Sequence, residues 1–276
     1  MKYAVLTVII CTHNRSRLLQ ECLKSLAAQT TSPGVFNILI VDNNSTDDTG
    51  EVIKEAVKEM PDIRTVFGTN QGIAQARNRG LTEAQTDWVA FIDDDAKARP
   101  DWVERILETI AKGDFDAFGG PYYACHPFGP PPAWLPENFW SYGGPKEYGP
   151  LGKFHIAGMN CALKKTAAKA AGRFPINLGM SGMAVAYGEE TLLFNRMIKQ
   201  GYRLGFVPTM RVDHCIMPRK YTVKWLLASA FALGRDTPYA FEAQFSWRGL
   251  LGAGRRCGKS VCTLLFSCCN LRAPRC

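Results

Sequence analysis

Two patterns of apolar residues alternate along the first half of the chain. Four short apolar runs containing β-branched side chains predict strands, at residues 4–11, 36–41, 63–67 and 88–92. Apolar residues at helical spacing predict helices between and after these runs, at residues 16–29, 45–60, 72–84 and 102–111. Strict alternation of strand and helix predicts an α/β fold in which a mostly parallel sheet carries helices on both faces.

The pattern changes in the second half of the chain. Residues 121–150 are rich in proline, glycine and aromatic side chains, and the three prolines at 130–132 prevent regular structure. The aromatic content argues against disorder, so we expect an ordered loop with a functional role. Helices are predicted at 163–171, 189–200 and 222–233, and a short strand at 204–207.

The charge distribution narrows the class of partner. The 276 residues carry a formal net charge of +8, and residues 235–276 hold seven basic and two acidic residues, so most of the excess lies in the tail. No nucleic-acid-binding motif occurs, and we do not expect nucleic acid as a partner. Basic residues flank the short apolar run 261–266, and Cys268 and Cys269 follow it, which suits an interfacial helix or a lipid anchor at a membrane surface. A disordered tail is the equal alternative.

Ten cysteines raise the question of the redox compartment. No Cys-x-x-Cys pair occurs, which argues against a zinc site, and no secretory signal peptide is apparent. We therefore expect a reduced, cytoplasmic protein, peripheral on the cytoplasmic face of a membrane where the tail binds one. No apolar stretch reaches the roughly 20 residues that a membrane-spanning helix needs.

Three consecutive aspartates, Asp93, Asp94 and Asp95, follow the strand predicted at 88–92. Polar side chains placed where a buried strand ends lie at the rim of an α/β sheet, where ligands bind. In extended geometry Asp93 and Asp95 share one side and can hold Mg²⁺ or Mn²⁺, with a diphosphate completing the coordination shell. Considered alone, the triplet fits a solvated acidic turn equally well.

Polar segments also follow the first two predicted strands. Thr12, Asn14 and Arg15 come directly after the first strand, where small polar residues before a helix suit a phosphate or base pocket. The Gly-x-Gly-x-x-Gly pattern of a Rossmann dinucleotide site is absent. Asp42 ends the second strand, beside Asn44, and its carboxylate can accept a hydrogen bond from a base N–H or a ribose hydroxyl. A structural turn is the alternative for each segment.

One predicted helix leads toward the aspartate triplet and carries a polar pair. Arg77 and Asn78 lie on it, and Arg77 is within reach of either Asp93 or a bound nucleotide. An exposed basic helix without a binding role is the alternative.

In order and spacing, these four segments resemble the family 2 glycosyltransferases of the GT-A fold. The resemblance is close over residues 4–95 and continues in pieces to residue 235. It implies that Asp42 contacts the nucleotide base and that Arg77 belongs to the family's Ala-Arg-Asn-x-Gly helix. The triplet resembles the metal-binding Asp-x-Asp, which implies Asp93 and Asp95 as metal ligands, with Asp95 as the direct one and Asp94 in the donor site.

Later segments extend the resemblance to the acceptor side. Residues 157–160 resemble a Gly-x-Asn segment, which implies Gly158 and Asn160 as acceptor-binding residues. Glu189 and Glu190 resemble an acidic pair whose second member is the catalytic base, which implies Glu190. Glu189 stays open as the base because glutamate stands where the family has aspartate. His214 resembles a late histidine that completes the metal site.

The resemblance implies transfer of a sugar from a nucleoside diphosphate sugar to a hydroxyl acceptor, by a single displacement with inversion. Mn²⁺ or Mg²⁺ is the implied cofactor. Asp42 favours a UDP donor, with dTDP and GDP open. The acceptor is expected to be a glycan or glycolipid in cell-surface polysaccharide or glycolipid synthesis, with Trp134 and Trp140 of the aromatic loop contacting it.

Three regions follow from this comparison, and other functions stay open. Residues 1–120 are expected to bind the nucleotide sugar, 121–221 the acceptor and the base, and 222–276 to form a helical, basic extension. A non-catalytic GT-A-like module at a membrane surface is the alternative function. A sugar-nucleotide pyrophosphorylase has a glycine-rich loop after its first strand, and a phosphatase with an aspartate nucleophile has its Asp-x-Asp there; this chain has neither.

Overall fold

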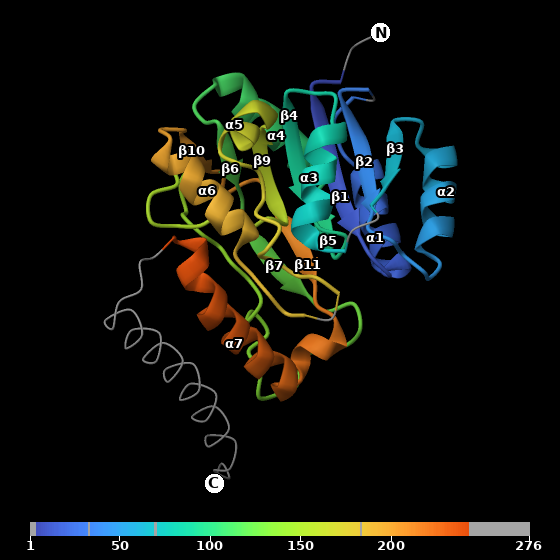
Figure 1. Ribbon diagram of the computed structural model, residues 1–276. Helices are drawn as coiled ribbons and strands as arrows, with labels where there is room; N and C mark the ends of the chain where they lie inside the picture. Colours follow the sequence, from blue (N-terminus) through green and yellow to red (C-terminus); the bar gives the residue numbers. More distant parts are fainter. Residues whose placement is uncertain (1–3, 33, 69–70, 183, 243–276) are drawn as a thin grey trace.

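The computed structural model describes residues 4–32, 34–68, 71–182 and 184–242. Its main feature is an eight-stranded sheet with helices on both faces, so that this part of the chain forms three layers (Figure 1). The strand order is β3-β2-β1-β4-β9-β6-β10-β8. The strands are β1 (Leu6–Thr12), β2 (Phe36–Asp42), β3 (Ile63–Phe67), β4 (Trp88–Ile92), β6 (Ala117–Gly119), β8 (Gly149–Pro150), β9 (Asn160–Lys164) and β10 (Leu204–Phe206).

The sheet is parallel in its first half and mixed in its second. β3, β2, β1 and β4 run parallel to one another, as the alternation of strand and helix predicts. β9 then pairs antiparallel with both β4 and β6, and β8 pairs antiparallel with β10. The sheet runs across the boundary predicted at residue 120, so residues 1–120 and 121–221 build one core. Their division by function stays a prediction.

The helices divide between the two faces of the sheet. α1 (Ser16–Ala27), α2 (Thr49–Glu59) and α4 (Trp102–Lys112) pack on one face, and α3 (Ile73–Glu83), α5 (Lys165–Ala170) and α6 (Glu189–Lys199) on the other. Alternate residues of β1 serve the two layers, with Ile10 in one core and Ile9 in the other. α3 lies very close to the sheet because Gly80 has no side chain; a Cβ there would be 2.6 Å from Ile9 Cγ2.

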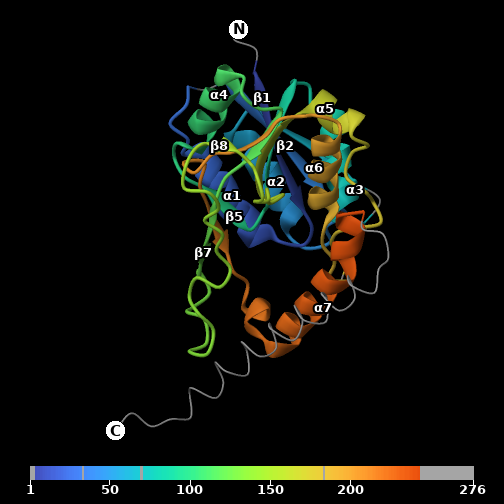
Figure 2. The ribbon, with the colours of Figure 1, turned by 90° about the vertical axis from the view of Figure 1, so that its left-hand side faces the viewer.

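A second, three-stranded sheet lies beside the end of β4. β11 (Val212–Cys215) is its central strand, antiparallel to β5 (Ala96–Ala98) and parallel to β7 (Tyr122–Cys125). His214 lies opposite Ala96, and the Cys215 N–H donates to the Asp95 carbonyl at 2.7 Å. The 3₁₀ turn η1 (Pro218–Tyr221) and α7 (Val223–Ala240) follow, and in Figure 2 α7 lies across from β7 and the loop that leaves it.

The structure corrects three predicted elements. The helix predicted at 163–171 begins only at Lys165, because the preceding residues form β9 in the middle of the sheet. The helix predicted from Ser45 begins at Thr49, and Asp47 rather than Ser45 accepts the hydrogen bond from the Thr49 N–H, at 3.0 Å. The last helix continues to Ala240, beyond the end predicted at residue 233.

The cysteines and the tail complete the comparison with the sequence. The cysteines within the described residues are free thiols, namely Cys11, Cys22, Cys125, Cys161 and Cys215, and all but the partly exposed Cys125 are buried. None of the helices in the described ranges is both long enough and apolar enough to cross a bilayer. The apolar run 261–266, Cys268 and Cys269 lie outside the described residues, so the predicted membrane attachment of this segment stays a prediction.

Candidate active site

The side chains predicted for donor binding gather at one edge of the main sheet. Thr12 ends β1, Asp42 ends β2, and the aspartate triplet follows Ile92 at the end of β4. These strands are parallel neighbours, so their carboxyl ends meet at the same edge. Thr12 and the triplet are joined directly, because Thr12 Oγ1 donates to Asp94 Oδ2 at 2.8 Å.

The triplet forms a turn, which corrects the expectation that Asp93 and Asp95 share one side. The Ala96 N–H donates to the Asp93 carbonyl at 3.0 Å, and the strand geometry of β4 ends at Ile92. Asp93 consequently pairs with Arg77, while Asp94 and Asp95 both face Arg15. The expectation was wrong because successive side chains point to opposite sides only in an extended strand, and these residues form a turn. In this structure Asp93 is an ion-pair partner of Arg77, and Asp95 remains the predicted metal ligand.

Arg15 neutralises the other two acids of the triplet. Its Nη1 donates to Asp94 Oδ1 at 2.7 Å and to Asp95 Oδ2 at 3.1 Å. Burial raises the pKa of Asp94 to about 6, against the opposing effect of Arg15. Two carboxylates therefore hold this guanidinium at the strand edge, where its remaining N–H groups suit contact with phosphate oxygens.

Arg77 connects the triplet to the predicted catalytic acids. Its Nη2 donates to Asp93 Oδ1 at 3.1 Å, and its Nη1 makes a short hydrogen bond to Glu189 Oε1. The Arg77 side chain is only 4% exposed. Gly158 lies against it, and a Cβ at that position would be 2.6 Å from Nη1. Gly158, expected to bind the acceptor, therefore makes room for Arg77.

The two glutamates at the start of α6 have different surroundings. Glu189 is 6% exposed, and burial raises its pKa to about 8, with the charge of Glu190 adding to the shift and Arg77 opposing it. Glu190 is only partly buried. Burial raises the pKa of the Tyr122 hydroxyl to about 12, and the negative charge of the nearby Glu190 adds to this shift. Glu189 is thus engaged with Arg77, whereas Glu190 lies beside the aromatic side of the site.

Asp95 and His214 form the pair that the resemblance assigned to a metal ion. His214 Nε2 lies 3.8 Å from Asp95 Oδ2, and both side chains are buried. Bonds from a divalent ion to nitrogen or oxygen are about 2.0–2.2 Å long, so one ion between these atoms can contact both. No group of three or more His, Cys, Asp or Glu that could hold an ion occurs among the described residues. The pair fits a divalent ion that takes its remaining ligands from a diphosphate.

Sequence reasoning missed one cation at this pair. Lys220, in η1, places Nζ 3.0 Å from His214 Nε2 and 3.5 Å from Asp95 Oδ2. Burial alone would raise the pKa of Asp95, but the positive charge of Lys220, followed by His214, holds it well below its usual range. The signal in the sequence is the basic pair Arg219 and Lys220, which lies a few residues after the strand that carries His214.

Two turns hold the residues predicted to contact the nucleoside. Asp42 is 3% exposed, and its Oδ1 accepts a hydrogen bond from the Ser45 N–H at 2.9 Å. Asn14 Oδ1 accepts from the Thr46 N–H at 2.7 Å and so joins the turn after β1 to the turn after β2. Asn44 is exposed and has a positive φ of 66°. The structure brings these residues to the same edge, and their contact with a base stays a prediction.

Asn160 has a structural role, which corrects its assignment to the acceptor. Its side chain is fully buried: Oδ1 accepts from Trp102 Nε1 at 2.8 Å, and Nδ2 donates to the carbonyls of Pro121 and Met210. These contacts tie β9 to α4 and to the second sheet, and they leave no exposed atom for a substrate. Trp134 and Trp140 lie partly buried in the segment after β7, and their contact with an acceptor stays a prediction.

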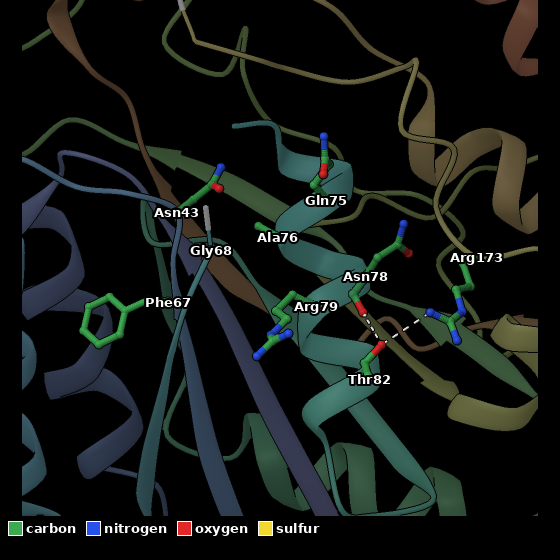
Figure 3. A pocket seen from close by; sticks show the side chains of 9 residues that line it. All are labelled: Asn43, Phe67, Gly68, Gln75, Ala76, Asn78, Arg79, Thr82 and Arg173. Carbon is green, nitrogen blue, oxygen red and sulfur yellow. Dashed lines mark hydrogen bonds between the residues drawn. The ribbon is translucent and has the colours of Figure 1, made fainter. Parts of the chain in front are cut away.

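A polar cavity of about 250 Å³ lies on another side of α3 (Figure 3). Arg79, Thr82 and Arg173 line it, and Thr82 Oγ1 accepts a hydrogen bond from Arg173 Nη1 at 3.4 Å. Asn43, the neighbour of Asp42, borders it as well. Arg77 points away from this cavity toward the acids, so α3 separates the two regions.

Comparisons with known proteins agree with this arrangement. The family model described as glycosyl transferase family 2 matches residues 7–170. The succinoglycan biosynthesis protein ExoM of Rhizobium meliloti (strain 1021) is 31% identical over 231 residues, which are 82% of this chain and 72% of the relative. A glucosyl-dolichyl phosphate glucuronosyltransferase of Haloferax volcanii is 28% identical over 246 residues, which are 83% of this chain and 74% of the relative.

A solved structure has the same fold. It is a mannosyltransferase from Pyrobaculum calidifontis, in complex with GDP-Man and Mn²⁺. The match covers 100% of this chain and 77% of the mannosyltransferase, with a TM-score of 0.67 and 18% sequence identity. At this identity the likeness concerns the fold, and it confirms the predicted GT-A architecture.

Proposed function

The chain belongs to glycosyl transferase family 2, and we propose that it moves a sugar from a nucleoside diphosphate sugar to a hydroxyl acceptor, with inversion at the anomeric carbon. One observation carries the proposal: Arg77 binds Asp93 and Glu189 at the same time. This ion pair ties the acidic turn at the donor edge of the sheet to the first turn of α6. It thereby brings Glu190 to the site where a donor would lie.

Glu190 is the proposed catalytic base. It would take the proton from the acceptor hydroxyl as that oxygen attacks the anomeric carbon, while the bond from this carbon to the diphosphate oxygen breaks. One base and no protein nucleophile give a single displacement, which inverts the configuration. Glu189 is hydrogen-bonded to Arg77, so we assign it the role of a positioning residue.

The leaving group would be held by the metal pair and by Arg15. Asp95 and His214 would hold a divalent ion, Mn²⁺ or Mg²⁺, whose positive charge would stabilise the departing diphosphate. Arg15 contacts Asp95 and Asp94 and so lies beside this pair, in reach of the same phosphates. Asp42 suits the N3–H of uracil or thymine. We therefore propose UDP as the donor nucleotide, with dTDP and GDP as the alternatives to test.

The acceptor is proposed to be a growing glycan or a glycolipid. The names of two relatives, a succinoglycan biosynthesis protein and a glucosyl-dolichyl phosphate glucuronosyltransferase, support this class. The aromatic segment after β7, with Trp134 and Trp140, offers flat apolar faces of the kind that pack against sugar rings.

A membrane surface is the proposed location of the reaction, on its cytoplasmic face. α7 exposes Val223, Leu227 and Phe231, four residues apart and therefore on one side of the helix, each more than half exposed. The sequence that follows, residues 243–276, contains six basic and no acidic residues, which suits anionic lipid headgroups. Flotation with phosphatidylglycerol vesicles tests this: Phe231→Asp should reduce binding, and vesicles of phosphatidylcholine alone should bind less.

The test of the catalytic proposal is nucleotide release from a panel of UDP-, dTDP- and GDP-sugars, with Mn²⁺ or with EDTA. Glu190→Gln should lower kcat at least about 100-fold, the loss expected for a missing general base, and should leave the donor KM close to that of the wild type. Glu55→Gln, on the exposed side of α2, is the matched control. NMR of the product anomer reports inversion. If no donor is turned over with Mn²⁺ or with Mg²⁺ in its place, the non-catalytic binding module is the better description.

A further inference from the structure

The pair proposed to hold the divalent ion is already in contact with a cation of the chain itself. Lys220 Nζ lies 3.0 Å from His214 Nε2 and 3.5 Å from Asp95 Oδ2. These are the two atoms that would ligate a metal, and they are 3.8 Å apart. An ammonium group donates hydrogen bonds and accepts none, so the contact uses the Nε2 lone pair that a metal would need.

Lys220 is held in this position by its neighbours. Its side chain is only 12% exposed. It lies in η1, between the strand that carries His214 and the start of α7, where Thr222 Oγ1 accepts a hydrogen bond from the Trp225 N–H at 3.2 Å. The adjacent Tyr221 hydroxyl is 2.7 Å from His126 Nδ1, which joins η1 to the segment after β7. The contact of Lys220 with the pair therefore follows from ordered backbone on both sides.

The charges around Asp95 and His214 allow Lys220 to leave without removing every cation from Asp95. Arg15 Nη1 contacts Asp95 Oδ2 as well, at 3.1 Å, so Asp95 keeps one partner when Lys220 moves. Arg219 adds a further positive charge nearby, and the acids Asp93 and Asp94 lie on the same turn. Nδ1 of His214 is buried without a hydrogen-bond partner in the described part of the chain, so Lys220 is the partner that fixes this ring through Nε2.

We propose that Lys220 is a displaceable counter-cation of the Asp95–His214 pair, which competes with the divalent ion and gives way to it. This inference rests on the proposed metal dependence. Without a divalent ion, Lys220 compensates the buried carboxylate of Asp95. A divalent ion carries twice the charge of an ammonium group, and it can displace Lys220 from both atoms. Lys220 is thus a positioning residue that lowers the affinity of the protein for free metal.

Binding of Mn²⁺ to the full-length protein without nucleotide tests the competition. Free Mn²⁺ is measured by EPR for the wild type, Lys220→Met and Lys224→Met. Lys220→Met should bind Mn²⁺ at least about 10-fold more tightly, because it keeps most of the length of the side chain and removes the competing charge. Lys224→Met removes the same charge from an exposed position in the first turn of α7 and should leave the affinity within about two-fold of the wild type. Structural damage would weaken binding, so a tighter Kd is specific to competition.

A second measurement uses the wild type alone and does not depend on folding of a variant. Acetylation of Lys220 by acetic anhydride, followed by mass spectrometry, should increase when Mn²⁺ is added, because the displaced ammonium leaves the buried pair. Equal Mn²⁺ affinity of wild type and Lys220→Met, or acetylation that does not rise, overturns the inference and leaves the metal proposal intact. No Mn²⁺ binding to either protein, both without nucleotide and with UDP, overturns both.

Discussion

Replacing Arg77 with methionine removes the only side chain that the structure shows bound to both Asp93 and Glu189. The change keeps most of the side-chain volume and leaves two carboxylates without their common partner. Breaking a buried ion pair by removing one member costs roughly 3–5 kcal/mol, because the remaining charge stays desolvated. Two features place the cost of Arg77→Met at the lower end of this range. Asp93 is 29% exposed and can be solvated again, and Glu189, with a pKa of about 8, holds a proton at pH 7 and so leaves no buried charge behind.

We therefore expect Arg77→Met to lower the free energy of unfolding by about 3 kcal/mol at pH 7. Urea unfolding followed by circular dichroism measures it, with the slope m compared to confirm that the unfolded state is unchanged. Arg79→Met is the control on the same helix. Its side chain is 52% exposed and pairs with Glu83 at 3.0 Å, so its loss should cost less than about 1 kcal/mol.

A double-mutant cycle shows whether the cost comes from the ion pair. Glu189→Gln removes the carboxyl group to which Arg77 Nη1 is hydrogen-bonded, so Arg77→Met should cost less in that background, by at least about 1 kcal/mol. Coupling near zero, or a cost for Arg77→Met no larger than that for Arg79→Met, would refute the view that this pair holds α6 to the sheet.

Two further predictions concern buried groups of the site. Between pH 4.5, its ordinary pKa, and about pH 8, Glu189 holds a proton in the folded state and releases it in the unfolded state. The free energy of unfolding therefore falls as the pH rises through that window, by at most about 1.4 kcal/mol per pH unit from this group. The free energies of unfolding of wild type and Glu189→Gln are measured from pH 5 to 8.5, and the difference between them should narrow or reverse with rising pH. A difference that stays constant contradicts the raised pKa of Glu189. Asn160→Ala leaves Trp102 Nε1 and two carbonyls without their buried partner and should destabilise the fold by roughly 2–4 kcal/mol, while the acceptor KM of the folded enzyme stays unchanged. A raised acceptor KM at full stability would restore Asn160 to the acceptor site.

The parallel half of the sheet was predictable because strands and helices there follow simple periods. The runs that became β2, β3 and β4 are apolar and bounded by polar turns, and the helices between them carry one apolar face. β9 was missed because a short buried antiparallel strand has the same composition as the start of a helix, and 163–171 continues into α5 without a turn signal. The second sheet joins residues 96–98, 122–125 and 212–215, and local patterns carry no information about pairing over such separations.

The candidate site shows the same division between local and long-range information. The residue types at the strand ends marked Thr12, Asp42 and the triplet, since polar groups after buried strands stand out in the sequence. Which acid faces which cation depends on the turn at Asp93 and on Lys220 arriving from η1, and neither follows from spacing. Gly158 and Asn160 were predicted to bind the acceptor, yet they pack around Arg77 and Trp102, because a motif identifies positions and not the direction of each side chain.

The pairing of β11 with β5 has a consequence for redesign of the enzyme. His214 lies opposite Ala96, one residue after Asp95, and the Cys215 N–H binds the Asp95 carbonyl at 2.7 Å. The spacing of the Asp95–His214 pair is therefore set by main-chain hydrogen bonds, which do not depend on side-chain identity. The aromatic segment that leaves the end of β7 is outside this ladder. If the segment contacts the acceptor as proposed, exchanging it would change which acceptor is used, and the ladder would keep Asp95 and His214 in register.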